Sequence, residues 1–345
     1  MKKLMTMFFC AGLAVVLASC GNGGKTLSGI DIAKFDTVIN EKPVQLYTLT
    51  NKNNMEVCIT NFGARVVSLM AKDRNGAFVD VVLGYDNIAQ YMDSVASPSK
   101  FGALTGGKDW EYQVFDAEQI DKQTLKLTLN SPEEGTVTAT YQLTDDNALD
   151  CTFEATPKDE KFLALTPNSY FTLTGDPSQA GTNMILRIYA DKFIPVDTTF
   201  AATGKLRDCY GSSMDFNKGR ALYELIGDTT EHQIKIADGF NHQYVLNSFK
   251  NGKGENMIAA SLYAENTGIF LEIFTNEPTL KLYSANDFGK SDVAGKNGVK
   301  YPKHVSVVLA PQNFPKAPAK AEWTSANVKS GETYKSHTIY RFSTK

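Results

Sequence analysis

The chain has 345 residues, of which 42% are hydrophobic and 21% charged, and its formal net charge is −3. Acidic and basic residues are evenly mixed, so the charge gives no electrostatic basis for binding nucleic acid. The length exceeds that of a typical domain, but all-β folds of this size often form one unit, and we therefore expect a single large domain.

The first twenty residues resemble the signal peptide of a bacterial lipoprotein. Lys2 and Lys3 precede an apolar stretch, residues 5–17, which is too short to span a membrane as a helix of the mature protein. The sequence then reads Leu-Ala-Ser-Cys and ends at Cys20, which such a signal leaves lipidated as the first mature residue. The alternative is an ordinary secretory signal that happens to contain a cysteine.

This reading predicts where the protein resides. Residues 1–20 would be the signal peptide, and the glycine-rich segment 21–30 a flexible tether between the lipid anchor and a domain spanning residues 31–345. The tether lacks the acidic run that resembles a surface-export signal in some Gram-negative lipoproteins. We therefore expect a protein anchored by lipid to the periplasmic side of the outer membrane of a Gram-negative bacterium.

Alternation of apolar and polar residues at a period of two predicts strands nearly throughout. Residues 44–50 and 55–60 form one alternating pair, and residues 65–71 and 78–83 form another, each joined by an Asn- or Gly-containing turn. A third hairpin is expected at 136–155, with a turn at 144–147. Only residues 88–94 suggest a short helix. The pattern is typical of an all-β protein built as a large antiparallel sandwich.

Three cysteines remain after the signal and the lipidated position: Cys58, Cys151 and Cys209. Cys151 lies in phase with the apolar positions of its predicted strand, so we expect it in the core. None of the cysteines has the spacing of a metal or redox site, and we expect neither a metal nor another cofactor.

Two segments carry the strongest functional signal. Residues 165–173 read LTPNSYFTL, and residues 309–315 read LAPQNFP. They resemble signature segments of the aldose 1-epimerases, the galactose mutarotase family, which read roughly N-H-S-Y-F-N-L and L-E-T-Q-H-F-P-D. Other segments resemble further motifs of this family in the same order: residues 61–65, 80–86, 191–197, 213–216, 239–246, 275–286 and 331–334.

The resemblance implies a fold and a reaction. The family fold is a large antiparallel β-sandwich, in agreement with the strand pattern. Mutarotation removes a proton from the anomeric hydroxyl and adds one to the ring oxygen, so it needs a base and an acid. In the family these are a glutamate and a histidine, and the matching positions here are Ala310 and Asn168. Neither side chain can transfer the proton.

Other positions that match the family's sugar contacts also differ. The family has a long excursion where this chain runs directly through residues 101–110, so several dozen residues are missing, and Thr105 stands in place of a histidine. Asn241 replaces a sugar-binding aspartate, which removes the charge-assisted part of a hydrogen bond. His242 is either a sugar contact or a partner at a strand end. The predicted substrate-binding residues are Asn168, Asn241, His242, Gln312, Thr105 and Tyr170.

Three functions are consistent with these observations. The first is a lipoprotein that binds an aldose or oligosaccharide in the family's groove without mutarotase activity. The second is an active aldose 1-epimerase that uses displaced groups, such as His242 with Glu277 or Asp215. The third is a protein-interaction lipoprotein whose groove receives a polypeptide.

Overall fold

The computed structural model describes residues 24–93, 100–290, 294–319, 321–323 and 327–345. The predicted signal peptide and Cys20 therefore lie outside the described residues. Residues 25–30, which the sequence places in the tether, form a turn packed on the domain, where Ile30 is buried and the Leu27 N–H donates to the Glu56 carboxylate at 2.6 Å. Within the described residues, no helix is long and apolar enough to cross a membrane.

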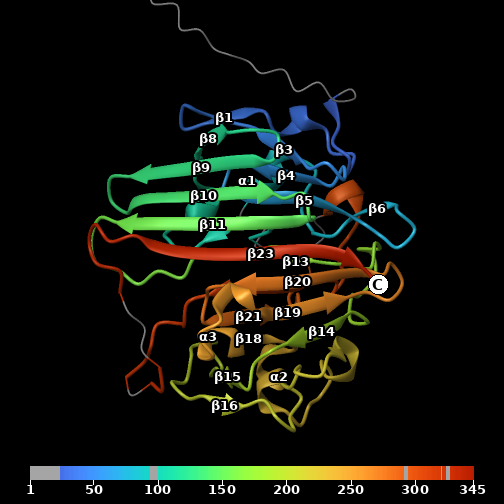
Figure 1. Ribbon diagram of the computed structural model, residues 1–345, viewed down its shortest axis with the longest axis vertical. Helices are drawn as coiled ribbons and strands as arrows, with labels where there is room; N and C mark the ends of the chain where they lie inside the picture. The colour runs from blue at the N-terminus through green and yellow to red at the C-terminus, as the bar shows by residue number, and fades with distance from the viewer. Residues whose placement is uncertain (1–23, 94–99, 291–293, 320, 324–326) are drawn as a thin grey trace, which may run out of the picture.

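The largest element is a nine-stranded antiparallel sheet. In Figure 1 its strands lie one below another, with β8 near the top of the view and β14 in the lower half. β8 to β11 pair in chain order, as do β19 and β20, while β23 near the C-terminus lies between β11 and β20 and joins the two parts of the sheet. In order across the sheet, the strands are β17 (Arg220–Ala221), β14 (Ile185–Ile188), β19 (Ile258–Tyr263), β20 (Ile269–Thr275), β23 (Tyr334–Thr344), β11 (Ala148–Pro157), β10 (Gly135–Leu143), β9 (Thr124–Ser131) and β8 (Asp116–Gln119).

Two further antiparallel sheets complete the sandwich. The six-stranded sheet contains β13 (Tyr170–Phe171), β22 (Val307–Gln312), β21 (Thr279–Tyr283), β18 (Asn241–Val245), β15 (Lys192–Ile194) and β16 (Arg207–Asp208), in that order. The four-stranded sheet contains β3 (Leu46–Thr50), β4 (Glu56–Thr60), β5 (Arg65–Lys72) and β6 (Phe78–Asp80).

The remaining elements are short. Two-stranded sheets pair β1 (Thr37–Ile39) with β2 (Lys42–Val44) and β7 (Leu104–Thr105) with β12 (Thr166–Pro167). The α-helices are α1 (Ile88–Met92), α2 (His232–Ala237) and α3 (Asn247–Lys250). The 3-10 helices are η2 (Ile32–Phe35), η3 (Trp110–Tyr112), η4 (Leu222–Glu224), η5 (Gly254–Asn256) and η6 (Lys296–Gly298).

The three predicted hairpins are confirmed. β3 pairs with β4, β5 with β6 and β10 with β11, and in β10 the apolar positions are buried while the threonines between them are not. The predicted short helix corresponds to α1, which Asn87 caps by accepting a hydrogen bond from the Gln90 N–H. Cys151 is buried in the core, as its phase in the strand predicts.

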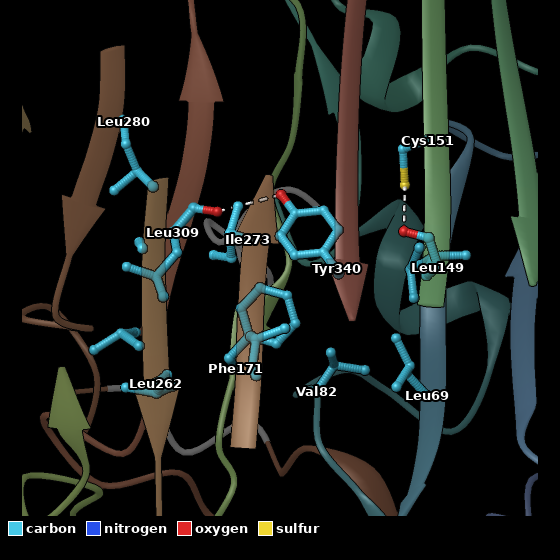
Figure 2. Close-up of a cluster of buried hydrophobic side chains, with 14 of the residues drawn as sticks. Leu69, Val82, Leu149, Cys151, Phe171, Leu262, Ile273, Leu280, Leu309 and Tyr340 are labelled. Atoms are coloured by element: carbon cyan, nitrogen blue, oxygen red, sulfur yellow. Dashed lines mark hydrogen bonds between the residues drawn. The ribbon is translucent and has the colours of Figure 1, made fainter. Parts of the chain in front are cut away.

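Side chains from all three large sheets meet in one core, shown in Figure 2. Leu280 and Leu309 come from the six-stranded sheet, and Ile273 from the nine-stranded sheet. Burying each such side chain contributes roughly 1.5–3 kcal/mol. The buried Tyr340 hydroxyl of β23 donates to the Leu309 carbonyl oxygen at 3.2 Å, which satisfies the hydroxyl and ties the two sheets together.

A glycine positions the segment that leads into the predicted site. Gly102 has a φ of +62°, and a Cβ at this position would lie 2.0 Å from the Val66 carbonyl oxygen. Its N–H donates to the Asn168 carbonyl oxygen at 2.7 Å, and its carbonyl oxygen accepts from the Val66 N–H at 3.1 Å. Only glycine fits this close approach, which fixes Phe101 on one side and Asn168 on the other.

Candidate functional site

The six-stranded sheet presents one face to the core and the other to the predicted site. In β21, Leu280 and Leu282 have no exposed surface and belong to the core. Because successive strand residues point to opposite faces, Thr279, Lys281 and Tyr283 point away from that core. We call this second surface the site face.

A row of side chains crosses the site face. Ala310 of β22 pairs with Lys281 of β21, and Lys281 pairs with Gln243 of β18. On the other side of β22, Tyr170 of β13 pairs with Val308. Continuing this antiparallel register by two residues places Asn168 beside Ala310. The positions that match the family's acid and base therefore lie on adjacent segments, and the row reads Asn168, Ala310, Lys281, Gln243.

Two further rows flank this one. On one side, Tyr283 pairs with Asn241 and with Val308, which in turn pairs with Tyr170. On the other side, Gln312 pairs with Thr279. The structure thus brings together on one face five positions that the sequence analysis singled out: Asn168, Tyr170, Asn241, Ala310 and Gln312.

Asn168 is held in place by the β7 segment. Its side-chain amide donates to the Thr105 hydroxyl at 2.7 Å, and its backbone N–H donates to the Ala103 carbonyl oxygen at 3.0 Å. The predicted binding residue Thr105 therefore positions Asn168. The amide can donate or accept a hydrogen bond, but it cannot supply a proton to a sugar ring oxygen.

Ala310 has no exposed surface, so its neighbours fully cover the methyl group at the position that matches the family's base. It belongs to an apolar cluster with Phe101, Tyr170 and Phe288. The Phe101 ring lies 4.9 Å from the Tyr170 ring and 5.6 Å from the Phe288 ring, centroid to centroid. Phe101 comes from the segment where the family's excursion is expected to be missing, and it belongs to the same apolar cluster as Ala310.

His242 lies on the core face of β18, opposite to the site face. It pairs with the buried Leu282, and its ring packs edge-on against Phe193 at a centroid distance of 6.0 Å. Its Nδ1 accepts a hydrogen bond from the Asn241 N–H at 3.1 Å. Burial, together with the nearby charges of Arg207 and Lys281, lowers the pKa of His242 to about 3, so the ring stays neutral. This placement gives His242 no direct contact with a ligand on the site face.

The carboxylates considered as displaced catalytic groups also lie elsewhere. Glu277 is buried, and both of its carboxylate oxygens accept the Tyr334 hydroxyl, at 2.6 and 2.8 Å. Asp215 lies in a loop and accepts from the backbone and side-chain N–H groups of Asn217. Neither residue belongs to the rows of the site face. The described residues also contain no cluster of His, Cys, Asp or Glu that could hold a metal ion.

Lys281 and Gln243 are the site-face residues that the sequence analysis missed. Lys281 lies beside Ala310, and among the described residues its ammonium group has no hydrogen-bond or ion-pair partner. Burial lowers the pKa of Lys281, and the nearby Lys100 lowers it further. Alternation within β21 could have placed Lys281 with Tyr283, but only the pairing with β22 shows that it adjoins the base position.

Comparisons with known proteins support the family that the sequence motifs indicate. The family model described as aldose 1-epimerase matches residues 45–108 and 101–341, and the two matched segments overlap within the stretch from which the excursion is expected to be missing. Galactose mutarotase from Mus musculus is 29% identical to this chain, covering 89% of it and 98% of the mouse protein. Aldose 1-epimerase from Escherichia coli K12 is 26% identical, covering 87% of this chain and 96% of that protein.

Solved structures share the fold. An aldose epimerase homologue from Caenorhabditis elegans superposes with a TM-score of 0.74 at 23% identity, covering 87% of this chain and 99% of that chain. Galactose 1-epimerase from Lactobacillus acidophilus superposes with a TM-score of 0.73 at 20% identity, covering 89% and 97%. Since the family model accounts for most of the sequence, the chain belongs to the aldose 1-epimerase family.

Proposed function

We propose that this protein is a lipid-anchored, carbohydrate-binding member of its family that lacks mutarotase activity. The observation that carries the proposal is the pair Asn168 and Ala310 at the acid and base positions, with Ala310 fully buried. The family's reaction needs proton transfer on both sides of the sugar's C1–O5 bond. An amide and a methyl group supply neither transfer.

The side chains around this pair suit sugar recognition. Asn241, Gln243 and Gln312 are partly exposed on the site face, and none of their side-chain amides is hydrogen-bonded to another described residue. Amides can donate to and accept from sugar hydroxyls at the same time. Tyr283 is also partly exposed there and offers a ring face for stacking against a pyranose. Convergent polar groups beside an aromatic surface are typical of a small-ligand site.

Purified protein is expected not to accelerate the exchange between the α- and β-anomers of galactose or glucose at neutral pH. Loss of one general acid or base typically lowers a rate about 10²- to 10⁴-fold, so loss of both should lower it by at least about 10⁴-fold. NMR exchange spectroscopy or polarimetry on freshly dissolved sugar measures this rate, with a mutarotase relative as the positive control. A clear acceleration by catalytic amounts of protein would refute the proposal.

One observation favours an active enzyme as the second candidate. Lys281 lies beside the vacated base position, and its lowered pKa would make the amine a better base at neutral pH. If the anomeric exchange does accelerate, the Lys281→Met variant tests this candidate, which predicts that the acceleration disappears. Retention of the acceleration in that variant would place the base elsewhere.

The lipid anchor is a separate part of the proposal and rests on the sequence ending at Cys20. When the full chain is expressed in a Gram-negative host, we expect it to fractionate with the outer membrane and to incorporate labelled palmitate. Cys20→Ser should abolish the label and remove the protein from the outer-membrane fraction, since the lipid is attached through this cysteine. Unchanged fractionation of Cys20→Ser, or an unlabelled wild type, would contradict the anchor.

A further inference from the structure

Lys281 differs from the other buried or paired lysines near the site. The buried Lys296 ammonium donates to the Val67 and Val82 carbonyl oxygens at 2.9 and 2.7 Å and pairs with the Asp80 carboxylate. Lys100 pairs with the carboxylate of Glu111. Lys281 is only partly exposed, yet its ammonium group has no partner among the described residues.

The remaining charges around the site face do not neutralise Lys281. The three rows contain no carboxylate. Among the described residues, the Asp287 carboxylate accepts from the hydroxyl of the row residue Tyr283 at 3.1 Å, and it pairs with Lys290 at 3.1 Å. At the far edge of the same face, Lys192 pairs with Asp208 at 3.0 Å. Among the described residues of the three rows, Lys281 therefore carries the one unpaired positive charge.

A partly buried charge without a partner is energetically unfavourable, and a ligand of opposite charge that pairs with it would offset this cost. The amides of Gln243 and Asn168 lie on opposite sides of Lys281, one and two strands away, which corresponds to about 5 Å and about 10 Å from it and about 15 Å from each other along the row. One hexose can reach the Gln243 amide while placing an exocyclic anionic group at the lysine, and a longer saccharide can reach the Asn168 amide as well. The amides would then bind its hydroxyl groups, and the ammonium group its charge.

On this basis, and building on the proposed carbohydrate binding, we propose that the ligand is an acidic saccharide whose carboxylate or sulfate group pairs with Lys281. The absence of carboxylates from the rows supports the same ligand class, because a carboxylate beside Lys281 would compete for the ammonium group and repel the anion. The shared chemistry is a hexose with one anionic substituent. Hexuronates supply it as a carboxylate and sulfated hexoses as a sulfate ester.

Calorimetric titration of the purified folded protein with galactose, galacturonate and galactose 6-sulfate tests this proposal. We expect at least one of the two acidic sugars to bind ten-fold or more tightly than galactose, and added salt to reduce this preference. The acidic sugar that is preferred identifies the anionic group. Equal affinity for galactose and both acidic sugars would overturn the acidic-ligand proposal and leave sugar binding intact, whereas no binding of any sugar would overturn both.

Variants of two lysines on the same face identify the residue responsible. Lys281→Met should remove the preference for acidic sugars, while Lys281→Arg should keep the preference. Lys192→Met is the matched control, because Lys192 lies on the same face but is already ion-paired, and it should leave all three affinities unchanged. A preference that persists in a folded Lys281→Met protein would overturn the assignment to Lys281.

Discussion

Replacing Phe101 with alanine is expected to destabilise the protein by about 3–5 kcal/mol, the usual range for truncating a buried aromatic side chain. Phe101 has no exposed surface, and its ring packs edge-on against the rings of Tyr85 and Tyr170, at centroid distances of 5.1 and 4.9 Å. Phe288 and Tyr301 also contact it. The fixed backbone at Gly102 limits how far the segment can collapse into the cavity, which favours the upper part of the range.

Urea unfolding followed by circular dichroism measures this loss as a shift of the midpoint with an unchanged slope. Phe249→Ala is the control, because the Phe249 side chain is 48% exposed and its truncation should change the free energy of unfolding by less than about 0.5 kcal/mol. A loss below about 1 kcal/mol for Phe101→Ala would show that the cluster around Ala310 is loosely packed. The site would then have space that the structure does not show.

Strand alternation was sufficient to predict most of the fold. In β10, for example, the apolar residues recur at every second position and are buried, because one face of this strand packs on the core and the other does not. Turn residues located the hairpins, since Asn and Asp favour tight connections. The order of strands within the nine-stranded sheet could not be predicted in this way. It depends on the position of β23 between β11 and β20, and the alternation of residues within each strand carries no information on that pairing.

The same reasoning explains what could be predicted of the site. Family motifs located Asn168 and Ala310, but they did not show that Lys281 adjoins Ala310, because this contact depends on the register between β21 and β22. Alternation alone would have separated Asn241 from His242, since consecutive residues in a strand point to opposite faces. Neither the strand pattern nor the motifs predicted that Phe101 would join the same apolar cluster as Ala310, because the two residues lie far apart along the chain.

The proposed function separates the residues that hold the site's backbone in place from the residues at the positions of the family's acid and base. The residues that orient the site, such as Thr105 and Gly102, act through backbone and side-chain hydrogen bonds that do not require the family's acid or base. Under the proposed function, Ala310 and Asn168 stand at the positions of the family's base and acid, and Lys281 places an ammonium group beside Ala310. A site with an ammonium group and no base is better suited to holding an anion than to removing a proton from a neutral sugar.

Glu277 provides the second large prediction, a dependence of stability on pH. Burial raises the pKa of Glu277 from 4.5 to about 7, although the hydrogen bond from the Tyr334 hydroxyl opposes the increase. Well below pH 4.5 the Glu277 carboxyl group is protonated in both the folded and the unfolded chain. The folded protein then buries a neutral group, and the free energy of unfolding carries no penalty from this residue. As the pH rises from 4.5 through about 7, the unfolded chain ionises first and stability is lost, by about 3 kcal/mol in total.

Glu277→Gln should remove this dependence, because the amide does not ionise and its oxygen can still accept the Tyr334 hydroxyl. The free energy of unfolding of the variant, relative to wild type, is therefore expected to increase by about 3 kcal/mol between pH 4 and pH 8. Urea unfolding at several pH values measures this difference, with Glu118→Gln as an exposed control on β8. Parallel pH profiles for wild type and Glu277→Gln would mean that the buried carboxyl group ionises as easily in the folded protein as in the unfolded chain.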